Sequence, residues 1–362
     1  MLNKILELAS KNGLLKKTLL PKVKIDQFNI GPIGLLLQNN LKLEWFYNVI
    51  INKDITVFPS DNNMSDTFDY AKDFCSQKLP FGIAEMKAYK KSYNSDEIIE
   101  YYKKAIDTEK LCFEDLLRHE ENMLMKCTIF ITPNNSTSFF HQWQRQRRMW
   151  WRKFSASPGK YSLSDIRSEE DGTQFVEISA KYDWGSQSLE TLVLDKQDRN
   201  YSSNQLQFKE KKFMQAHTIT SQVNLSTILL NSICDAFDEA PFQDKKRLLF
   251  RFHRKLAPYK ISFALSGSNQ ASLAELNDLA MYLCKQLRSN HISTLFIPNS
   301  SRLTLDSQYQ QYDQLGIPYT VLLNGNTLKN GIISLRSRDT TLKEQIHVTE
   351  LVPYVEKLYR NY

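Results

Sequence analysis

Two clusters of basic residues have the types and spacing to do chemistry, and that chemistry would be phosphate binding. On a helical wheel of the segment 141–154, Arg145, Arg148 and Arg152 share one face, and the tryptophans of the segment lie largely opposite. Such a face could bind phosphate groups while the tryptophans anchor the helix. A core-facing aromatic stripe with a solvated basic back explains the same pattern, so both interpretations stand.

The second cluster lies in the segment 245–255, where arginines follow helical spacing and predict a basic helix that ends before Pro258. The same two interpretations apply to it. A basic loop that includes Lys211 and Lys212 adds a weaker signal. The nucleic-acid-binding residues predicted from these segments are Arg145, Arg148, Arg152, Lys211, Lys212, Arg247, Arg251 and Arg254.

Motifs for catalysis or for holding a metal or cofactor are not visible in the sequence. It contains no P-loop, no G-x-S-x-G, no H-E-x-x-H and no G-x-G-x-x-G. The 6 histidines are scattered, and the 5 cysteines form no C-x-x-C pair. We therefore predict no catalytic residue, no metal and no cofactor. The sequence favours a binding role over catalysis.

The bulk composition is that of a globular protein with room for two domains. The chain has 362 residues, 41% of them hydrophobic, and a net charge of +7. This mild positive charge suits a protein that meets a polyanion without requiring one. No segment approaches the ~20 apolar residues of a membrane span. The amphipathic N-terminus could be a mitochondrial presequence, but we favour an ordinary first helix that Asn12 and Gly13 close.

The last hundred residues alternate between strand and helix patterns. Strands are expected at 258–265, 293–298, 318–324 and 331–337, and helices at 273–290, 305–315 and 348–358, with a Ser272–Glu275 capping box before the first of these helices. This order predicts a small α/β domain with a largely parallel sheet.

The preceding residues mix helices and strands without regular alternation. Helices are expected after the turn at 31–34, across 95–125 and across 141–154, and strands at 128–132, 174–182 and 188–194. A strand and a polar loop are expected within 54–82, and 217–237 reads as helix-forming. These elements predict an α+β domain with an antiparallel sheet over 1–255, followed by the α/β domain over 256–362.

The order of segments resembles class II aminoacyl-tRNA synthetases of the glycyl and prolyl type. The sequence GPIGLLLQNN followed by Trp45 is similar to their motif 1 region, and LPFGIAEM (79–86) is similar to the segment leading into motif 2. The segments QRRMWWRKFSASP (146–158), LAPYKISFAL (256–265) and NGIISLRSRDTTLKEQIHVTEL (330–351) further resemble the accessory subunits of mitochondrial DNA polymerase gamma. The resemblance implies a synthetase-like domain followed by an anticodon-binding-like domain.

Departures from the synthetase pattern imply that the ancestral activity is lost. Lys90 and Lys91 stand where motif 2 would supply an arginine for ATP, and a lysine lacks the planar fork of an arginine. Motif 3 requires a glycine-rich segment that ends in an arginine, but no glycine occurs between Gly185 and Gly267. The interval between Phe58 and Leu79 is too short for the helical insertion by which vertebrate members dimerise, so a monomer is expected.

The resemblance therefore implies a non-catalytic accessory subunit that binds the catalytic subunit of the mitochondrial polymerase one to one and strengthens its hold on primer–template DNA. A divergent aminoacyl-tRNA synthetase and a free tRNA- or DNA-binding protein are the alternatives. The expected localisation is the mitochondrial matrix and nucleoid, and membrane association is not expected. Arg336, Arg338 and Asp339 could form a charged rim for the partner, although a local salt-bridge network that fixes the turn would use the same residues.

Overall fold

The computed structural model describes residues 1–20, 25–61, 64–90, 117, 121–198, 200–202, 205–209, 213–242, 245–267, 269–297 and 302–360. The chain divides into two compact units. The first comprises Met1–Leu2, Leu15–Gly31 and Leu41–Ser232, and the second comprises Asn3–Leu14, Pro32–Asn40 and Ile233–Tyr362. Neither unit is continuous in sequence, and the predicted division between residues 255 and 256 stays a prediction.

The first unit is built on an eight-stranded sheet in the order β3-β4-β5-β12-β9-β8-β6, with β7 paired to β8. Its strands are β3 (Val57–Ser60), β4 (Phe81–Lys90), β5 (Glu121–Ile131), β6 (Tyr161–Leu163), β7 (Arg167–Ser168), β8 (Gln174–Tyr182), β9 (Gly185–Asp195) and β12 (His217–Asn224). Only the β3–β4 pair is parallel among these described strands. The predicted antiparallel α+β architecture is thus confirmed.

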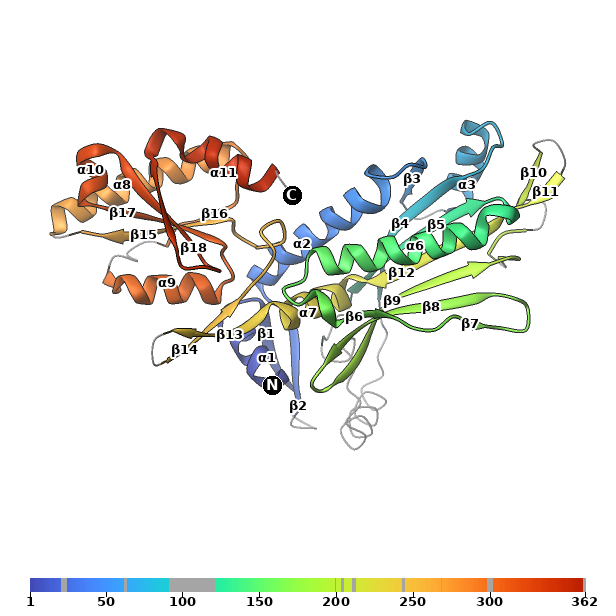
Figure 1. The fold of residues 1–362 in the computed structure, drawn as a ribbon, viewed down its shortest axis with the longest axis horizontal. Helices are drawn as coiled ribbons and strands as arrows, with labels where there is room; N and C mark the ends of the chain where they lie inside the picture. The colour runs from blue at the N-terminus through green and yellow to red at the C-terminus, as the bar shows by residue number, and fades with distance from the viewer. Residues whose placement is uncertain are drawn as a thin grey trace. The chain divides into compact units, whose positions relative to one another are not determined.

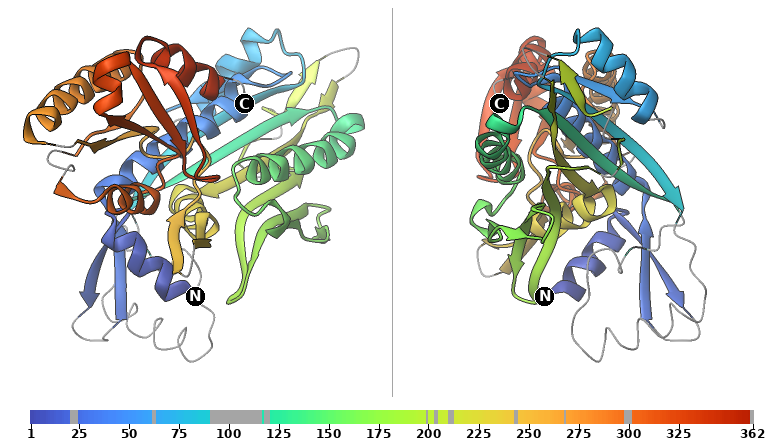
Figure 2. Two further views of the ribbon diagram at one scale, coloured as in Figure 1. Left: turned by 60° about the vertical axis from the view of Figure 1, so that its left-hand side comes forward. Right: turned by 90° about the vertical axis from the view of Figure 1, so that its right-hand side faces the viewer.

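Helices and two short ribbons complete this unit. The helices are η1 (Tyr47–Ile51), α3 (Met64–Phe74), α6 (Pro133–Lys153) and η2 (Pro158–Lys160). In one ribbon β1 (Leu15–Leu20) pairs with β2 (Ile25–Ile30), and in the other β10 (Gln207–Lys209) pairs with β11 (Phe213–Gln215). Helices α2 (Pro32–Phe46) and α7 (Leu225–Ala236) each contribute residues to both units. Figures 1 and 2 show α6 running along one face of the sheet, where it contacts β12 and β9.

The two faces of this sheet are covered by different cores. Successive side chains of a strand point to opposite faces, so Ile129 and Phe130 of β5 belong to different layers. Phe130 stacks on its register partner Phe81 with ring centroids 5.1 Å apart, and it lies 4.8 Å from the ring of Phe68 on α3. Aromatic packing of this kind holds α3 against one face and leaves the other face to α6.

The second unit contains a five-stranded sheet in the order β16-β15-β17-β18-β19. Its elements are α1 (Leu2–Lys11), β13 (Phe237–Phe242), β14 (Lys245–Phe250), β15 (Ile261–Ser266), α8 (Gln270–Ser289), β16 (Thr294–Leu295), α9 (Leu305–Gln314), β17 (Tyr319–Asn324), α10 (Gly325–Asn330), β18 (Ile332–Ser337), β19 (Lys343–His347), η4 (Val348–Glu350) and α11 (Leu351–Arg360). Strands β16, β15 and β17 are parallel, whereas β18 and β19 are antiparallel. The sheet is therefore mixed, and β19 was not predicted.

Most predicted helices of this unit are confirmed, with corrected ends. Helix α8 begins at Gln270 because Asn269 is its N-cap and Ser272 completes the capping box, so the predicted Ser272–Glu275 box is wrong. The residues between β17 and β18 form the short helix α10, which ends at Asn330 and is capped by Gly331 with a φ of 70°. Helix α1 is closed as predicted, and Gly13 has a φ of 68°.

Four other secondary-structure predictions are wrong in whole or in part. Residues 245–250 form strand β14 and not a basic helix. This strand pairs with β13, and its Leu249 and Phe250 are buried. The stretch 217–237 begins with strand β12 before α7 starts, because Thr218, Ile219 and their neighbours pair on both sides in the sheet. The expected polar loop within 54–82 contains α3. Of the helix expected across 95–125, residues 121–125 are strand, and most of the remainder lies outside the described residues.

Within the described parts of the chain, no helix is both long and apolar enough to cross a membrane.

Candidate anion-binding groove and arginine clusters

Helix α6 carries the first predicted basic cluster, and its orientation agrees with the helical wheel. The helix starts with Pro133 at its first turn, where a missing N–H costs nothing. The tryptophans of the helix are buried, whereas Arg145 and Arg152 are exposed and Arg148 is half-buried. The predicted role of these three arginines in nucleic-acid binding is untested and stays a prediction.

A fourth arginine of this helix, which the sequence prediction missed, lies in the protein interior. The Arg147 side chain is 0% exposed and donates from Nε and Nη2 to the two carboxylate oxygens of Glu190 on β9, at 2.7 and 3.1 Å. Trp151 Nε1 also donates to Glu190, at 2.7 Å, and Arg147 Nη1 donates to Asn48 Oδ1 at 3.1 Å. This network ties α6 to β9 and to the π-helical segment η1. The signal was present, because Arg147 lies four residues from both Trp143 and Trp151, on the buried face.

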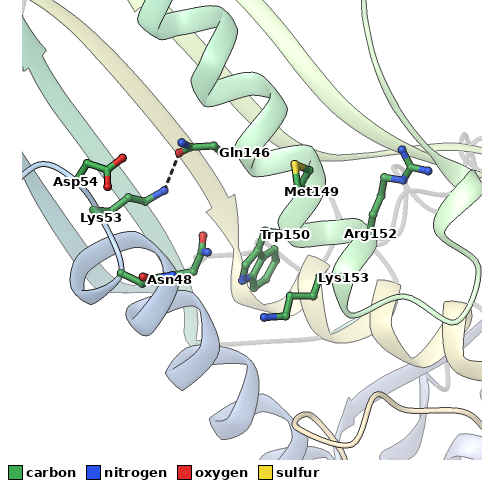
Figure 3. Close-up of a pocket in the computed structure, with 9 residues that line it drawn as sticks. Asn48, Lys53, Asp54, Gln146, Met149, Trp150, Arg152 and Lys153 are labelled. Atoms are coloured by element: carbon green, nitrogen blue, oxygen red, sulfur yellow. Dashed lines mark hydrogen bonds between the residues drawn. The ribbon is translucent and has the colours of Figure 1, made fainter. Parts of the chain in front are cut away.

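Beside this network, α6 and η1 enclose a groove of about 660 Å³, which we call the Lys53 groove (Figure 3). Its lining residues are Asn48, Asn52, Lys53, Asp54, Gln146, Met149, Trp150, Arg152 and Lys153. Figure 3 shows Lys53 reaching Gln146 and Lys153 extending beneath the indole of Trp150, whereas the guanidinium of Arg152 points away from Lys53. Three cations against one carboxylate give the groove the chemistry of an anion-binding site.

Lys53 is the most constrained of these cations. Its Nζ donates to Gln146 Oε1 at 3.0 Å and lies 4.3 Å from the ring centroid of the buried Trp143. Burial, followed by the positive charge of Arg147, lowers the pKa of Lys53 from 10.5 to about 8. Lys53 is therefore charged at pH 7, at a cost in stability that an anionic ligand would offset.

We expect this cost to appear as a pH dependence of stability. Below pH 8 Lys53 is protonated in both the folded and the unfolded protein, but between pH 8 and 10.5 only the unfolded protein keeps the proton. Raising the pH through this window therefore stabilises the folded state. The Lys53→Met variant should be more stable than the wild type at pH 7, and this advantage should shrink by roughly 2 kcal/mol toward pH 10.5. Urea titrations of both proteins at several pH values measure it; an advantage that does not change with pH would contradict the assignment.

The second predicted basic cluster and the predicted partner-binding residues meet in one network of the second unit. Asp313 on α9 accepts from Arg336 Nη1 and Nη2 at 2.9 and 3.0 Å, and from Arg247 Nη1 at 3.0 Å. Arg336 also lies over the Tyr309 ring, with its guanidinium carbon 4.4 Å from the centroid. Asp313 is thus shared by two arginines that lie far apart in the sequence.

Arg338 extends this network to the backbone. It donates to the carbonyl oxygens of Gly316 and Phe252, at 2.8 and 3.0 Å, and pairs with Asp339. Burial opposes ionisation of Asp339, but Arg338 and Arg251 outweigh it and hold the pKa of this carboxyl below its usual value. Arg338 and Arg336 are only 2% and 5% exposed, so the local salt-bridge interpretation describes their observed contacts. Their role in partner binding is untested.

The remaining predicted site residues either have contacts within the second unit or lie outside the described part of the chain. Arg251 pairs with Asp238 at 2.6 Å, and Arg254 donates to the Leu358 carbonyl oxygen at 2.7 Å. The nucleic-acid role of Arg247, Arg251 and Arg254 stays a prediction, although each has a protein partner here. Lys211 and Lys212 lie outside the described residues.

The places where a synthetase would bind ATP are also partly visible. Lys91 lies outside the described residues. Within the glycine-free interval in which the resemblance places motif 3, β12 carries Thr218 and Thr220, whose hydroxyls bond to Asp198 and Thr128 at 3.1 Å each. The segment 217–236 that forms β12 and α7 contains no arginine, lysine or glycine. This segment therefore offers hydroxyl and amide groups but no fixed positive charge.

Comparison with known proteins confirms the resemblance expected from the sequence. Residues 264–358 match the family model of the anticodon binding domain. The chain is 28% identical to the mitochondrial DNA polymerase subunit gamma-2 of Xenopus laevis, over 78% of this chain and 60% of the relative. It is 30% identical to that of Drosophila melanogaster (64% and 65%) and 26% identical to a glycine–tRNA ligase of Borreliella burgdorferi (79% and 62%). The chain thus matches less than two thirds of the length of these relatives, and its fold is that of a synthetase-like α+β domain followed by an anticodon-binding-like α/β domain.

Proposed function

We propose that this chain is a non-catalytic accessory subunit of the mitochondrial DNA polymerase. It binds the catalytic subunit one to one in the mitochondrial matrix and nucleoid and strengthens the hold of that subunit on primer–template DNA. The proposal is supported by two facts taken together. The chain is similar both to gamma-2 subunits and to glycine–tRNA ligases, and its segment 217–236, where motif 3 is expected, contains neither arginine nor glycine. The fold of an enzyme is retained, and the groups that serve ATP are missing from this segment.

The mechanism is thermodynamic and needs no chemistry from this chain. An added subunit that contacts the polymerase supplies interactions that must break before DNA is released, so it acts mainly on the dissociation rate. In this proposal residues 1–255 form the degenerate synthetase-like domain and residues 256–362 the anticodon-binding-like domain. The former keeps its sheet as a scaffold, and the latter has the architecture that synthetases use to hold a second macromolecule.

The runner-up, a working aminoacyl-tRNA synthetase, differs in a reaction that is simple to measure. We expect no exchange of radioactive pyrophosphate into ATP with glycine, or with any other amino acid, because β12 and α7 place no guanidinium on the phosphates. A glycine–tRNA ligase assayed in parallel provides the positive control. Exchange by this chain that rises with amino-acid concentration would reject the non-catalytic assignment.

A further inference from the structure

We propose that the Lys53 groove binds a peptide segment of a protein partner, one that carries acidic side chains and an apolar side chain. The inference rests on the proposed function only for the identity of the partner, the polymerase catalytic subunit. It adds the chemistry of recognition and places one docking site on the first unit.

The cations of the groove are not neutralised from within. Lys53 Nζ is held by Gln146 and by the Trp143 ring, neither of which carries a charge. Arg152 and Lys153 are exposed, and no carboxylate in the described part of the chain lies within ion-pair distance of them. Asp54 is the one acidic residue of the lining and forms no ion pair with Lys53. The groove thus presents positive charge for a ligand to neutralise.

Two side-chain amides add hydrogen-bond donors to the same groove. A cation can only donate, so each amide must turn its oxygen toward the cation that it contacts. The side-chain oxygen of Asn48 accepts from Arg147 at 3.1 Å, and the side-chain oxygen of Gln146 accepts from Lys53 at 3.0 Å. The N–H groups of both amides are left to donate. With the cations, they form a set of donors suited to carboxylate and peptide carbonyl oxygens.

Apolar side chains beside these donors favour a peptide over a nucleic acid. Met149 lines the groove and is 67% exposed, and Ile51 and Tyr47 are 60% and 54% exposed on the segment that supplies Asn48. A phosphodiester backbone gains little from such groups, whereas an apolar peptide side chain would bury them. Exposed apolar groups beside unpaired cations match an acidic amphipathic segment.

The environment of Lys53 gives this binding a specific signature. Lys53 faces Arg147 from α6, Cys127 from β5, Glu190 from β9 and Asp54 from its own loop. A carboxylate bound beside Lys53 adds negative charge and raises its pKa from about 8. Binding at pH 8 should therefore take up about half a proton through Lys53.

The test is calorimetric titration of the full chain with the full-length catalytic subunit at pH 8, in buffers of different ionisation enthalpy. We expect Lys153→Glu to weaken binding about 10-fold or more, and Lys53→Met to weaken binding and abolish the proton uptake. Lys181→Glu is the matched control, because Lys181 is exposed on β8 and its change in charge is the same; it should change the affinity less than about 2-fold. Thermal melts establish that each variant is folded.

Any of the following results would overturn the inference, and they differ in whether the proposed function is rejected as well. Unchanged affinity of Lys153→Glu, or equal weakening by Lys181→Glu, would reject the groove while leaving the accessory role standing. No complex with the wild-type chain would reject both. Fluorescently labelled single-stranded and duplex DNA form a second arm, and a loss of DNA affinity without a loss of partner affinity would show that the groove binds phosphate instead.

Discussion

Replacing Asp313 with alanine is expected to lower the free energy of unfolding of the second unit by about 3–5 kcal/mol. Its side chain is 1% exposed and accepts three hydrogen bonds from Arg247 and Arg336, whose side chains are 10% and 6% exposed. Removing the carboxylate leaves two guanidinium groups with little access to water and without the counter-charge that they share. The cost is mainly this uncompensated charge, and only partly the lost attraction.

Urea titration followed by circular dichroism measures the effect, and hydrogen exchange of strands β15 and β17 assigns it to the second unit. Asp306→Ala is the control, because Asp306 is an exposed acid in the first turn of the same helix and should contribute only about 0.3–1 kcal/mol. A loss of similar size in both variants would mean that the Asp313 network is not the source of the stability.

Replacing Glu190 with alanine is expected to have a comparable effect in the first unit, about 3–5 kcal/mol. Glu190 and Arg147 are both 0% exposed in their side chains, and Glu190 also accepts from Trp151. The variant therefore leaves a buried guanidinium and an indole N–H without their acceptor. Urea titration measures the loss, and hydrogen exchange of β9 localises it.

A double variant distinguishes the cost of an orphaned charge from the loss of packing. Replacing a buried ion pair by apolar residues of similar volume is often neutral, so Arg147→Met with Glu190→Leu should recover most of the stability that Glu190→Ala loses. Glu169→Ala, in an exposed turn, should cost little and serves as the control. If the double variant is less stable than the single one, the pair is worth more than its desolvation cost and this argument is wrong.

The elements that could be predicted from the sequence are those with a strong local pattern. Helix α8 buries Leu276, Leu283 and Leu287 along one face, and that repeat alone specifies the helix. Strand β14 was misread because its arginines match a helical period, whereas the strand is specified by its pairing with β13, which a local pattern does not show. Long-range pairing decides such segments.

The same distinction separates the predicted site residues from the observed contacts. Arg247 and Arg336 were assigned to different surfaces, because nothing local indicates that Asp313 lies between them. Arg147 was passed over for its exposed neighbours, although its spacing from Trp143 places it on the buried face. Basic clusters identified from the sequence therefore contain both solvent-exposed side chains and side chains in buried ion pairs.

Primer extension on a long single-stranded template, with the catalytic subunit alone or with this chain added, tests whether this chain acts as an accessory subunit of the polymerase. We expect longer products at the same extent of primer use, because contacts from this chain slow release of the template. Light scattering of the same mixture should give the mass of one catalytic subunit with one copy of this chain. Products of unchanged length, with a catalytic subunit that is active and a chain that is folded, would contradict the proposed function.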